Sequence, residues 1–191
     1  MITDTFDKTT QEVLKELEKT QHDFWNISRT TAEFLYNLIV DGGIKNVLEV
    51  GTSNGYSGIW LGKALKKTGG KLTTIEFYEK RIVLAKENFE KCQVDDIIEI
   101  KQGDASTILE YLPDDFKIDL AFVDACKKQY IDFFHLIEPH LVVGGYIACD
   151  NVISHAQKVQ PFLEDINSNQ NYENVVLPLP AGLSLGKKLR G

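Results

Sequence analysis

The sequence predicts an α/β fold, a doubly wound and mostly parallel sheet with helices on both faces. Short apolar runs alternate with helical segments between residues 46 and 149, as in strands joined by helical crossovers. These runs are nearly continuous in apolar residues, which indicates strands buried on both faces. Two further strand-like runs flank the short turn Pro180–Gly182, so at least one C-terminal strand is expected to run antiparallel. We find no internal repeat or linker, so residues 1–191 are expected to form one domain, with residues 1–25 as an N-terminal helical extension.

Two longer helices are expected before the first strand. Apolar residues recur at helical spacing from about Thr9 to Gln21. A second helix is expected to start near Thr30, because Thr30–Glu33 reads as a capping box. It should end at Gly42-Gly43, since glycine readily adopts the left-handed conformation of a helix cap.

The remaining elements follow in alternating order. The expected strands are Asn46–Val50, Lys71–Ile75, Ile97–Ile100, Ile118–Val123, Tyr146–Cys149, Asn174–Leu179 and Leu183–Leu189. The expected helices are Ser57–Lys67, Tyr78–Cys92, Ala105–Tyr111, Tyr130–His140 and His155–Asn167. In open sheets of this kind, ligands bind at the carboxyl ends of the strands, so the residues that follow each strand are candidates for a site.

Composition excludes several classes of protein. No run of 18 apolar residues occurs, so no membrane-spanning helix is expected, and Met1–Lys15 lacks the pattern of a signal peptide. The widely spaced Cys92, Cys126 and Cys149 fit a reducing cytoplasm better than a disulfide framework. A net charge of −7 argues against a protein that coats duplex nucleic acid, although a local basic strip stays possible. We therefore expect a cytoplasmic protein with no membrane partner.

The most specific local signal is a glycine loop after the first apolar run. Gly51 and Gly55 would let the backbone turn tightly and approach a ligand with no Cβ in the way. The loop lacks the Gly-x-Gly-x-x-Gly spacing of dinucleotide sites, because residue 53 is serine. It also lacks the lysine of a P-loop, because Tyr56-Ser57 follows Gly55. The pattern Glu49-x-Gly51-x-x-x-Gly55 thus favours a ligand with less negative charge than a nucleotide phosphate.

Polar residues also follow the next two strands. Glu76 ends the second strand, where its carboxylate can accept two hydrogen bonds from the vicinal hydroxyls of a ribose. A solvated acid at a strand end is the alternative. The third strand is followed by Gly103-Asp104-Ala105, which would either contact an adenine edge or cap the next helix through Asp104. Both roles can hold together.

Two later strands end in oxygen-bearing side chains. Asp124 follows one strand, and Asp150-Asn151 follow the next. If the two strands are parallel neighbours, these side chains converge beside the glycine loop. Two carboxylates and one amide oxygen are hard ligands suited to Mg²⁺. The alternative is that the acids cap helices at strand ends.

Three motifs taken in order resemble the class I S-adenosylmethionine-dependent O-methyltransferases of the catechol and caffeoyl-CoA type. They are Leu48–Ser57, Val123–Lys127 and Gly144–Asn151, and the resemblance covers roughly Asn26 to Lys188. It implies a Rossmann-like fold, S-adenosylmethionine as cofactor, a small hydroxylated acceptor and a homodimer. The implied cofactor-binding residues are Ile27, Glu49, Gly51, Thr52, Ser53, Gly55, Ser57, Glu76, Gly103, Asp104, Ala105 and Asp124.

The resemblance also implies catalytic roles. Asp124, Asp150 and Asn151 would bind Mg²⁺ or another divalent cation, and Lys127 would act as general base beside Asp124. A lysine can act as a base only if its surroundings lower its pKa from about 10.4. The alternative is that Lys127 is a solvated surface residue like Lys128. In the expected reaction, Lys127 takes the proton of an acceptor hydroxyl, whose oxygen then attacks the sulfonium methyl group.

Three departures from the family pattern leave the acceptor open. Cys126 stands where relatives of the caffeoyl-CoA type carry an acid, and Ala181 replaces an aspartate before Gly182. No acid is evident at Ser184, where the catechol enzyme grips its substrate. Two alternative functions stay open: methylation of a hydroxylated tRNA base, and a module that binds S-adenosylmethionine without turnover. The complete set of metal-type residues with Lys127 favours catalysis over binding alone.

Overall fold

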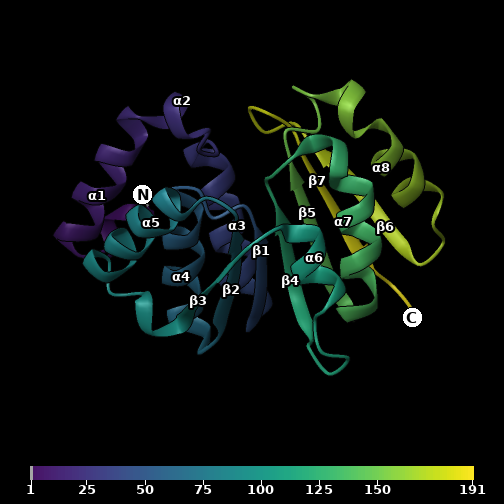
Figure 1. Ribbon diagram of the computed structural model, residues 1–191, viewed down its shortest axis with the longest axis horizontal. Helices are drawn as coiled ribbons and strands as arrows, with labels where there is room; N and C mark the ends of the chain where they lie inside the picture. Colours follow the sequence, from purple (N-terminus) through teal and green to yellow (C-terminus); the bar gives the residue numbers. More distant parts are fainter. Residues whose placement is uncertain (1) are drawn as a thin grey trace.

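The computed structural model describes residues 2–191 and centres on a seven-stranded sheet, ordered β3-β2-β1-β4-β5-β7-β6 (Figure 1). Strands β1 to β5 are parallel to one another, whereas β7 is antiparallel to both of its neighbours, β5 and β6. This confirms the predicted mostly parallel sheet with an antiparallel C-terminal strand. The strands are β1 (Asn46–Val50), β2 (Lys71–Glu76), β3 (Ile98–Gln102), β4 (Ile118–Val123), β5 (Leu141–Asp150), β6 (Tyr172–Leu177) and β7 (Leu183–Lys188).

Helices cover both faces of the sheet. One layer consists of α3 (Arg29–Gly42), α4 (Tyr56–Thr68) and α5 (Glu79–Lys91), and α1 (Lys8–Lys19) packs beside α5. The other layer consists of α6 (Ala105–Glu110), α7 (Tyr130–Ile137) and α8 (Ala156–Ser168). Figure 1 shows α1 and the short α2 (Gln21–Phe24) at the end of the molecule away from α8. Four 3₁₀ turns complete the elements of the described chain: Ile2–Thr5, Asp95–Ile97, Lys127–Gln129 and Glu138–His140.

The central strands contribute to a hydrophobic core on each side of the sheet. In β4, Leu120 and Phe122 face the core beneath α3 and α4, while Ala121 and Val123 face the core beneath α7 and α8. All four residues are fully buried. Because successive side chains of a strand point to opposite faces, a strand between two cores must be apolar at nearly every position. This explains the continuous apolar runs that predicted the fold.

The structure corrects several predicted boundaries. Helix α3 begins at Arg29, because Ser28 is its N-cap and accepts a hydrogen bond from the Thr31 amide. The predicted capping box at Thr30 was therefore wrong, and Glu33 instead pairs with Arg29, at a nitrogen–oxygen distance of 3.2 Å. Strand β5 begins at Leu141, five residues before the predicted Tyr146, because its early part extends through Gly144 and Gly145.

The strand order reverses between β1 and β4. Residues that follow these two strands therefore lie side by side at one edge of the sheet, together with those that follow β2 and β5. Loops at such a reversal form the ligand crevice of open α/β sheets. Among the described residues, none of the helices is both long enough and apolar enough to cross a membrane. That residues 1–191 form one domain, with 1–25 as an extension, stays a prediction, and Met1 lies outside the described residues.

Candidate active site

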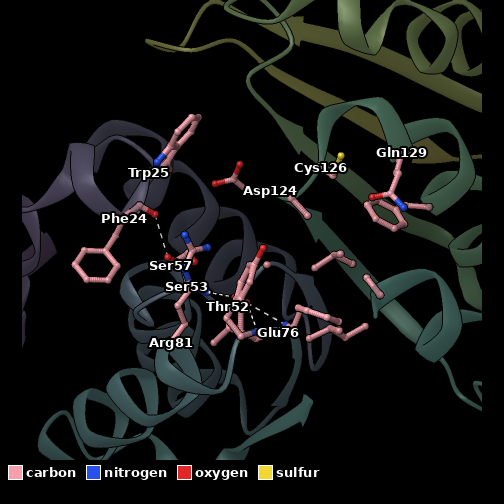
Figure 2. A pocket seen from close by; sticks show the side chains of 18 of the residues that line it. Phe24, Trp25, Thr52, Ser53, Ser57, Glu76, Arg81, Asp124, Cys126 and Gln129 are labelled. Atoms are coloured by element: carbon pink, nitrogen blue, oxygen red, sulfur yellow. Dashed lines mark hydrogen bonds between the residues drawn. The ribbon is translucent and has the colours of Figure 1, made fainter. Parts of the chain in front are cut away.

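A cavity of about 370 Å³ opens at the carboxyl ends of β1, β2 and β4 (Figure 2). Most of the predicted cofactor-binding residues line it: Ile27, Gly51, Thr52, Ser53, Ser57, Glu76, Gly103, Asp104, Ala105 and Asp124. Lys127 lines it as well. Glu49 and Gly55 do not line the cavity, and they support its wall from behind. The structure thus brings together residues from five segments that are distant in the sequence.

The glycine loop forms the floor of the cavity. Gly51 adopts a φ of +109°, and a Cβ at this position would lie 2.3 Å from the backbone oxygen of Asp124. Only glycine lets the β1 and β4 ends approach so closely. The amides of Gly51 and Thr52 both donate to the carbonyl of Ile75, at 3.0 and 3.2 Å, which ties the loop to β2. Gly55 then caps α4 with a φ of +87°.

Glu49 is fully buried behind this loop. Its carboxylate accepts hydrogen bonds from the Ser57 hydroxyl at 2.5 Å and the Thr74 hydroxyl at 2.6 Å. The Thr52 hydroxyl lies 2.6 Å from that of Thr74 and extends the network to the cavity wall. Burial raises the pKa of Glu49 from 4.5 to about 7, although both hydrogen bonds favour the charged form. Glu49 is therefore poised between its neutral and charged forms near neutral pH.

Glu76 is held by backbone donors at the end of β2. Its carboxylate accepts from the amides of Ser53 at 2.8 Å, Phe77 at 3.0 Å and Tyr78 at 2.9 Å. These bonds link the carboxylate to the glycine loop and fix its orientation at the cavity wall (Figure 2). Asp104 caps α6 by accepting from the Thr107 amide at 3.0 Å, so the predicted capping role is confirmed.

Asp124 and Asp150 lie at the ends of the neighbouring parallel strands β4 and β5. The registered pair Val123 and Cys149 directly precedes them. Asp150 is 2% exposed, and its Oδ1 atom has no hydrogen-bond partner within residues 2–191. Burial, with repulsion from Asp124, raises the pKa of Asp150 from 3.8 to about 7. A buried carboxylate oxygen without a partner beside a second carboxylate is a strong candidate to face a cation.

Lys127 and Asn151 complete this corner of the site. The Lys127 Nζ atom lies 2.6 Å from Asp124 Oδ1, and both side chains are 14% exposed. Lys127 is therefore not the solvated surface lysine that was the alternative. Asn151 adopts a left-handed φ of +65°, and its carbonyl accepts from the His155 amide at 2.9 Å. Within residues 2–191 no group of three or more His, Cys, Asp or Glu side chains is arranged to hold a metal, in keeping with the predicted set, which has only two acids.

The C-terminal turn supports the segment after Asn151 through its backbone. The Ala181 carbonyl accepts from the amides of Ile153 and Ser154, both at 3.0 Å. Ala181 thus contributes a backbone oxygen that any residue at this position would supply. The Ser184 hydroxyl donates to Asn174 at 2.7 Å within the β6–β7 hairpin, so its side chain is already engaged there.

The cysteines lack the features of a nucleophile. Cys149 is buried, and burial raises the pKa of its thiol well above the ordinary value. Cys126 is exposed and lines the cavity, but no hydrogen bond to its thiol is found within residues 2–191.

His155 follows Asn151 by four residues. Its Nδ1 atom lies 3.0 Å from the Ser154 hydroxyl. Burial, together with the charges of Lys158 and Lys127, lowers the pKa of His155.

Sequence reasoning missed the aromatic rim of the cavity. Trp25 is 72% exposed, adopts a left-handed φ of +61° at the end of α2, and is drawn to the left of Asp124 in Figure 2. Phe24, Phe77, Tyr78 and Arg81 also line the opening. The only sequence signal was a group of aromatic residues next to predicted site residues. The Ser53 hydroxyl donates to the Phe24 carbonyl at 3.0 Å, which joins this rim to the glycine loop.

The chain is similar to known O-methyltransferases in both sequence and fold. Residues 4–189 match the sequence model of the O-methyltransferase family. A catechol O-methyltransferase of Niastella koreensis is 34% identical over 67% of this chain and 58% of its own length. Caffeoyl-CoA O-methyltransferase 2 of Populus trichocarpa is 28% identical over 94% of this chain and 83% of its own. The O-methyltransferase of Bacillus cereus, solved in complex with SAH, is 27% identical, with a TM-score of 0.84 over 98% of this chain and 94% of its own.

Proposed function

The chain belongs to the family of class I S-adenosylmethionine-dependent O-methyltransferases, and we propose that it methylates a small acceptor with two adjacent hydroxyl groups. We propose further that the reaction depends on Mg²⁺ or another divalent cation. The observation that carries the proposal is a pair of neighbouring strand ends. Asp124, paired with Lys127, follows β4 and lines the cavity, and the buried Asp150 ends β5 beside it. A protein that only binds the cofactor has no need of two converging carboxylates and a paired lysine.

The cavity has the features that S-adenosylmethionine requires. The glycine loop at Gly51 offers close backbone approach, and Glu76 offers carboxylate oxygens for the ribose hydroxyls. The B. cereus relative in complex with SAH supports this assignment, because its fold matches nearly the whole chain. Ile27 and Ser57 also line the cavity and would contact the cofactor there.

The residues present fit a divalent cation. Asp150 Oδ1 is buried without a hydrogen-bond partner among the described residues, and Asp124 and Asn151 add further hard oxygens beside it. A cation at this corner would stabilise the ionised form of an acceptor hydroxyl. Burial and the nearby charge of Asp124 raise the pKa of Asp150 because they destabilise its charged form. The same two causes would give this carboxylate its affinity for a divalent cation, since a positive partner stabilises the charged form.

The chain's own residues would position the reactants and move one proton. Asp124 and Lys127 both line the cavity, and the hydrogen bond from Lys127 Nζ to Asp124 Oδ1 would hold the lysine in place beside the reactants. In its neutral amine form, Lys127 Nζ would take the proton of the acceptor hydroxyl and become an ammonium beside Asp124. S-adenosylmethionine, when bound, would supply the methyl group, and its transfer from sulfur to the acceptor oxygen would leave a methyl ether and S-adenosylhomocysteine. The exposed ring of Trp25 at the rim would shield the reacting groups from water.

The experiment that tests this function measures S-adenosylhomocysteine release with a panel of vicinal-diol phenols, in Mg²⁺ and in EDTA. We expect turnover only in Mg²⁺. The Asp150→Asn variant should lose turnover and keep cofactor affinity, whereas Asp132→Asn, the same change at an exposed position of α7, should keep both. Turnover in EDTA would refute the metal site, and turnover only with hydroxylated tRNA would move the acceptor to that class. Cofactor binding without any turnover would support the binding-module alternative. A homodimeric, cytoplasmic enzyme is also part of the proposal, and light scattering tests the dimer.

A further inference from the structure

A single buried hydroxyl contacts the ends of both strands that carry the carboxylates. Tyr130 begins α7 and is 1% exposed. Its hydroxyl oxygen lies 3.2 Å from the Val123 carbonyl and 3.1 Å from the Asp150 carbonyl. Val123 ends β4 directly before Asp124, and Asp150 ends β5. The hydroxyl therefore bridges the backbone at the two points from which the carboxylates extend.

The position of this bridge matters because the strand ladder ends there. Within the β4–β5 pair, the last registered residues are Val123 and Cys149, so no β4–β5 pairing joins the two strands beyond them. Each strand end is held by backbone pairing on its other side, where the Asp124 amide donates to the Val50 carbonyl and Asp150 pairs with Leu183 of β7. The hydroxyl carries one proton and donates to one carbonyl at a time, but both carbonyls lie within hydrogen-bond distance. The hydroxyl can thus fix the distance between the ends of β4 and β5 beyond the last β4–β5 backbone pair.

The ring of Tyr130 is itself held in place. It packs edge-to-face on Phe162 of α8, with 6.2 Å between ring centroids. The ammonium of Lys127 lies 5.8 Å from the centroid of the Tyr130 ring, within the range of a cation–π contact. Tyr130 is therefore fixed by α8 and lies beneath the lysine that pairs with Asp124. Its hydroxyl has little freedom to leave the two carbonyls.

We propose that Tyr130 is a positioning residue of the divalent-cation site, whose hydroxyl sets the separation of the Asp124 and Asp150 strand ends. The inference rests on the proposed metal-dependent function. Tyr130 does not line the cavity, so it would act only by spacing the two carboxylates that bind the cation. Residues that orient metal ligands from behind commonly change metal affinity by about 10-fold to 100-fold when they are replaced.

The test is Mg²⁺ binding by titration calorimetry with S-adenosylhomocysteine present, so that no turnover is needed. The Tyr130→Phe variant removes only the hydroxyl and keeps the ring contacts with Phe162 and Lys127. We expect Mg²⁺ affinity to fall about 10-fold, while the affinity for S-adenosylhomocysteine stays within about 2-fold. High Mg²⁺ concentrations should restore turnover to the wild-type level.

Tyr36→Phe is a matched control. Tyr36 is also buried, carries a lysine over its ring at 5.6 Å, and its hydroxyl has no hydrogen-bond partner among residues 2–191. It should leave Mg²⁺ affinity unchanged. Wild-type Mg²⁺ affinity in Tyr130→Phe would overturn the positioning role and leave the proposed function standing. Equal losses of Mg²⁺ and S-adenosylhomocysteine affinity would overturn it too, because they would indicate general loosening. Absence of Mg²⁺ binding by the wild type would instead refute the metal site itself.

Discussion

Replacing Glu49 with glutamine is expected to change how the stability of the protein depends on pH. The carboxyl group is fully buried, and burial raises its pKa from 4.5 to about 7. Glutamine keeps the shape of the side chain, and the hydroxyls of Ser57 and Thr74 can rotate to hydrogen-bond its amide. The substitution therefore removes the charge with little change in packing.

The sign follows from the direction of the pKa change. A carboxyl group whose pKa is higher in the folded chain contributes stability that is fully present below the unfolded pKa of 4.5. This contribution is lost as the pH rises through the folded pKa of about 7. The pKa difference between the folded and unfolded chain corresponds to about 3 kcal/mol of stability, of which roughly 2 kcal/mol is lost between pH 5 and pH 8. Between pH 5 and pH 8, the free energy of unfolding of Glu49→Gln should therefore rise by roughly 2 kcal/mol relative to that of the wild type.

Urea unfolding at pH 5, 6, 7 and 8 in EDTA measures this gain. EDTA removes divalent cations, so the contribution of Asp150 is the same in every protein compared. Glu110→Gln, the same change at an exposed position of α6, should track the wild type at each pH. Parallel stability profiles for the wild type and Glu49→Gln would refute the argument, because they would mean that the buried carboxyl group does not change its charge in this range.

Three other changes test the site. Gly51→Ala should cost roughly 3 kcal/mol or more in urea unfolding, because its Cβ would lie 2.3 Å from the backbone oxygen of Asp124; near-wild-type stability would contradict the close approach of β1 and β4. Lys127→Gln should lower kcat by about 10²-fold to 10⁴-fold with cofactor affinity kept, while the exposed neighbour Lys128→Gln should leave kcat unchanged. Cys126→Ala should keep kcat within about 2-fold, and a larger loss in the methyl-transfer assay would assign the thiol a part in the reaction.

The fold could be predicted because it is encoded locally. Strands between two cores must be apolar at nearly every position, and the helices between them show their own period. The residues after each strand were found for the same reason, since topology alone brings Asp124 and Asp150 together. The strand boundaries were less certain. At the start of β5, Gly144 and Gly145 resemble a turn, and only pairing with β4 shows that the strand continues.

Contacts that depend on tertiary structure could not be predicted. Glu49 reads as a cofactor ligand in the sequence, yet its carboxylate is satisfied by Ser57 and Thr74 behind the cavity wall. Tyr130 carries no pattern that reveals its hydroxyl contacts, because they join residues 7 and 20 positions away. The rim residue Trp25 was missed because its exposure and left-handed backbone are set by the end of α2. These residues act through geometry that a one-dimensional pattern does not contain.

The acids of the chain differ in what they do for stability, as Asp7, Glu49 and Asp150 show. Asp7 lies on the far helical layer, where hydrogen bonds from Lys63 and Thr10 outweigh its partial burial and hold its pKa well below the ordinary value. Its charge therefore stabilises the fold. Glu49 and Asp150, beside the cavity, have raised pKa values because they are buried without a cationic partner of their own. Natural selection readily removes buried acids that only destabilise, since glutamine or asparagine would fit. Their presence at one edge of the sheet is explained if the cationic partner arrives with the reaction, as a sulfonium cofactor near Glu49 and a divalent cation at Asp150.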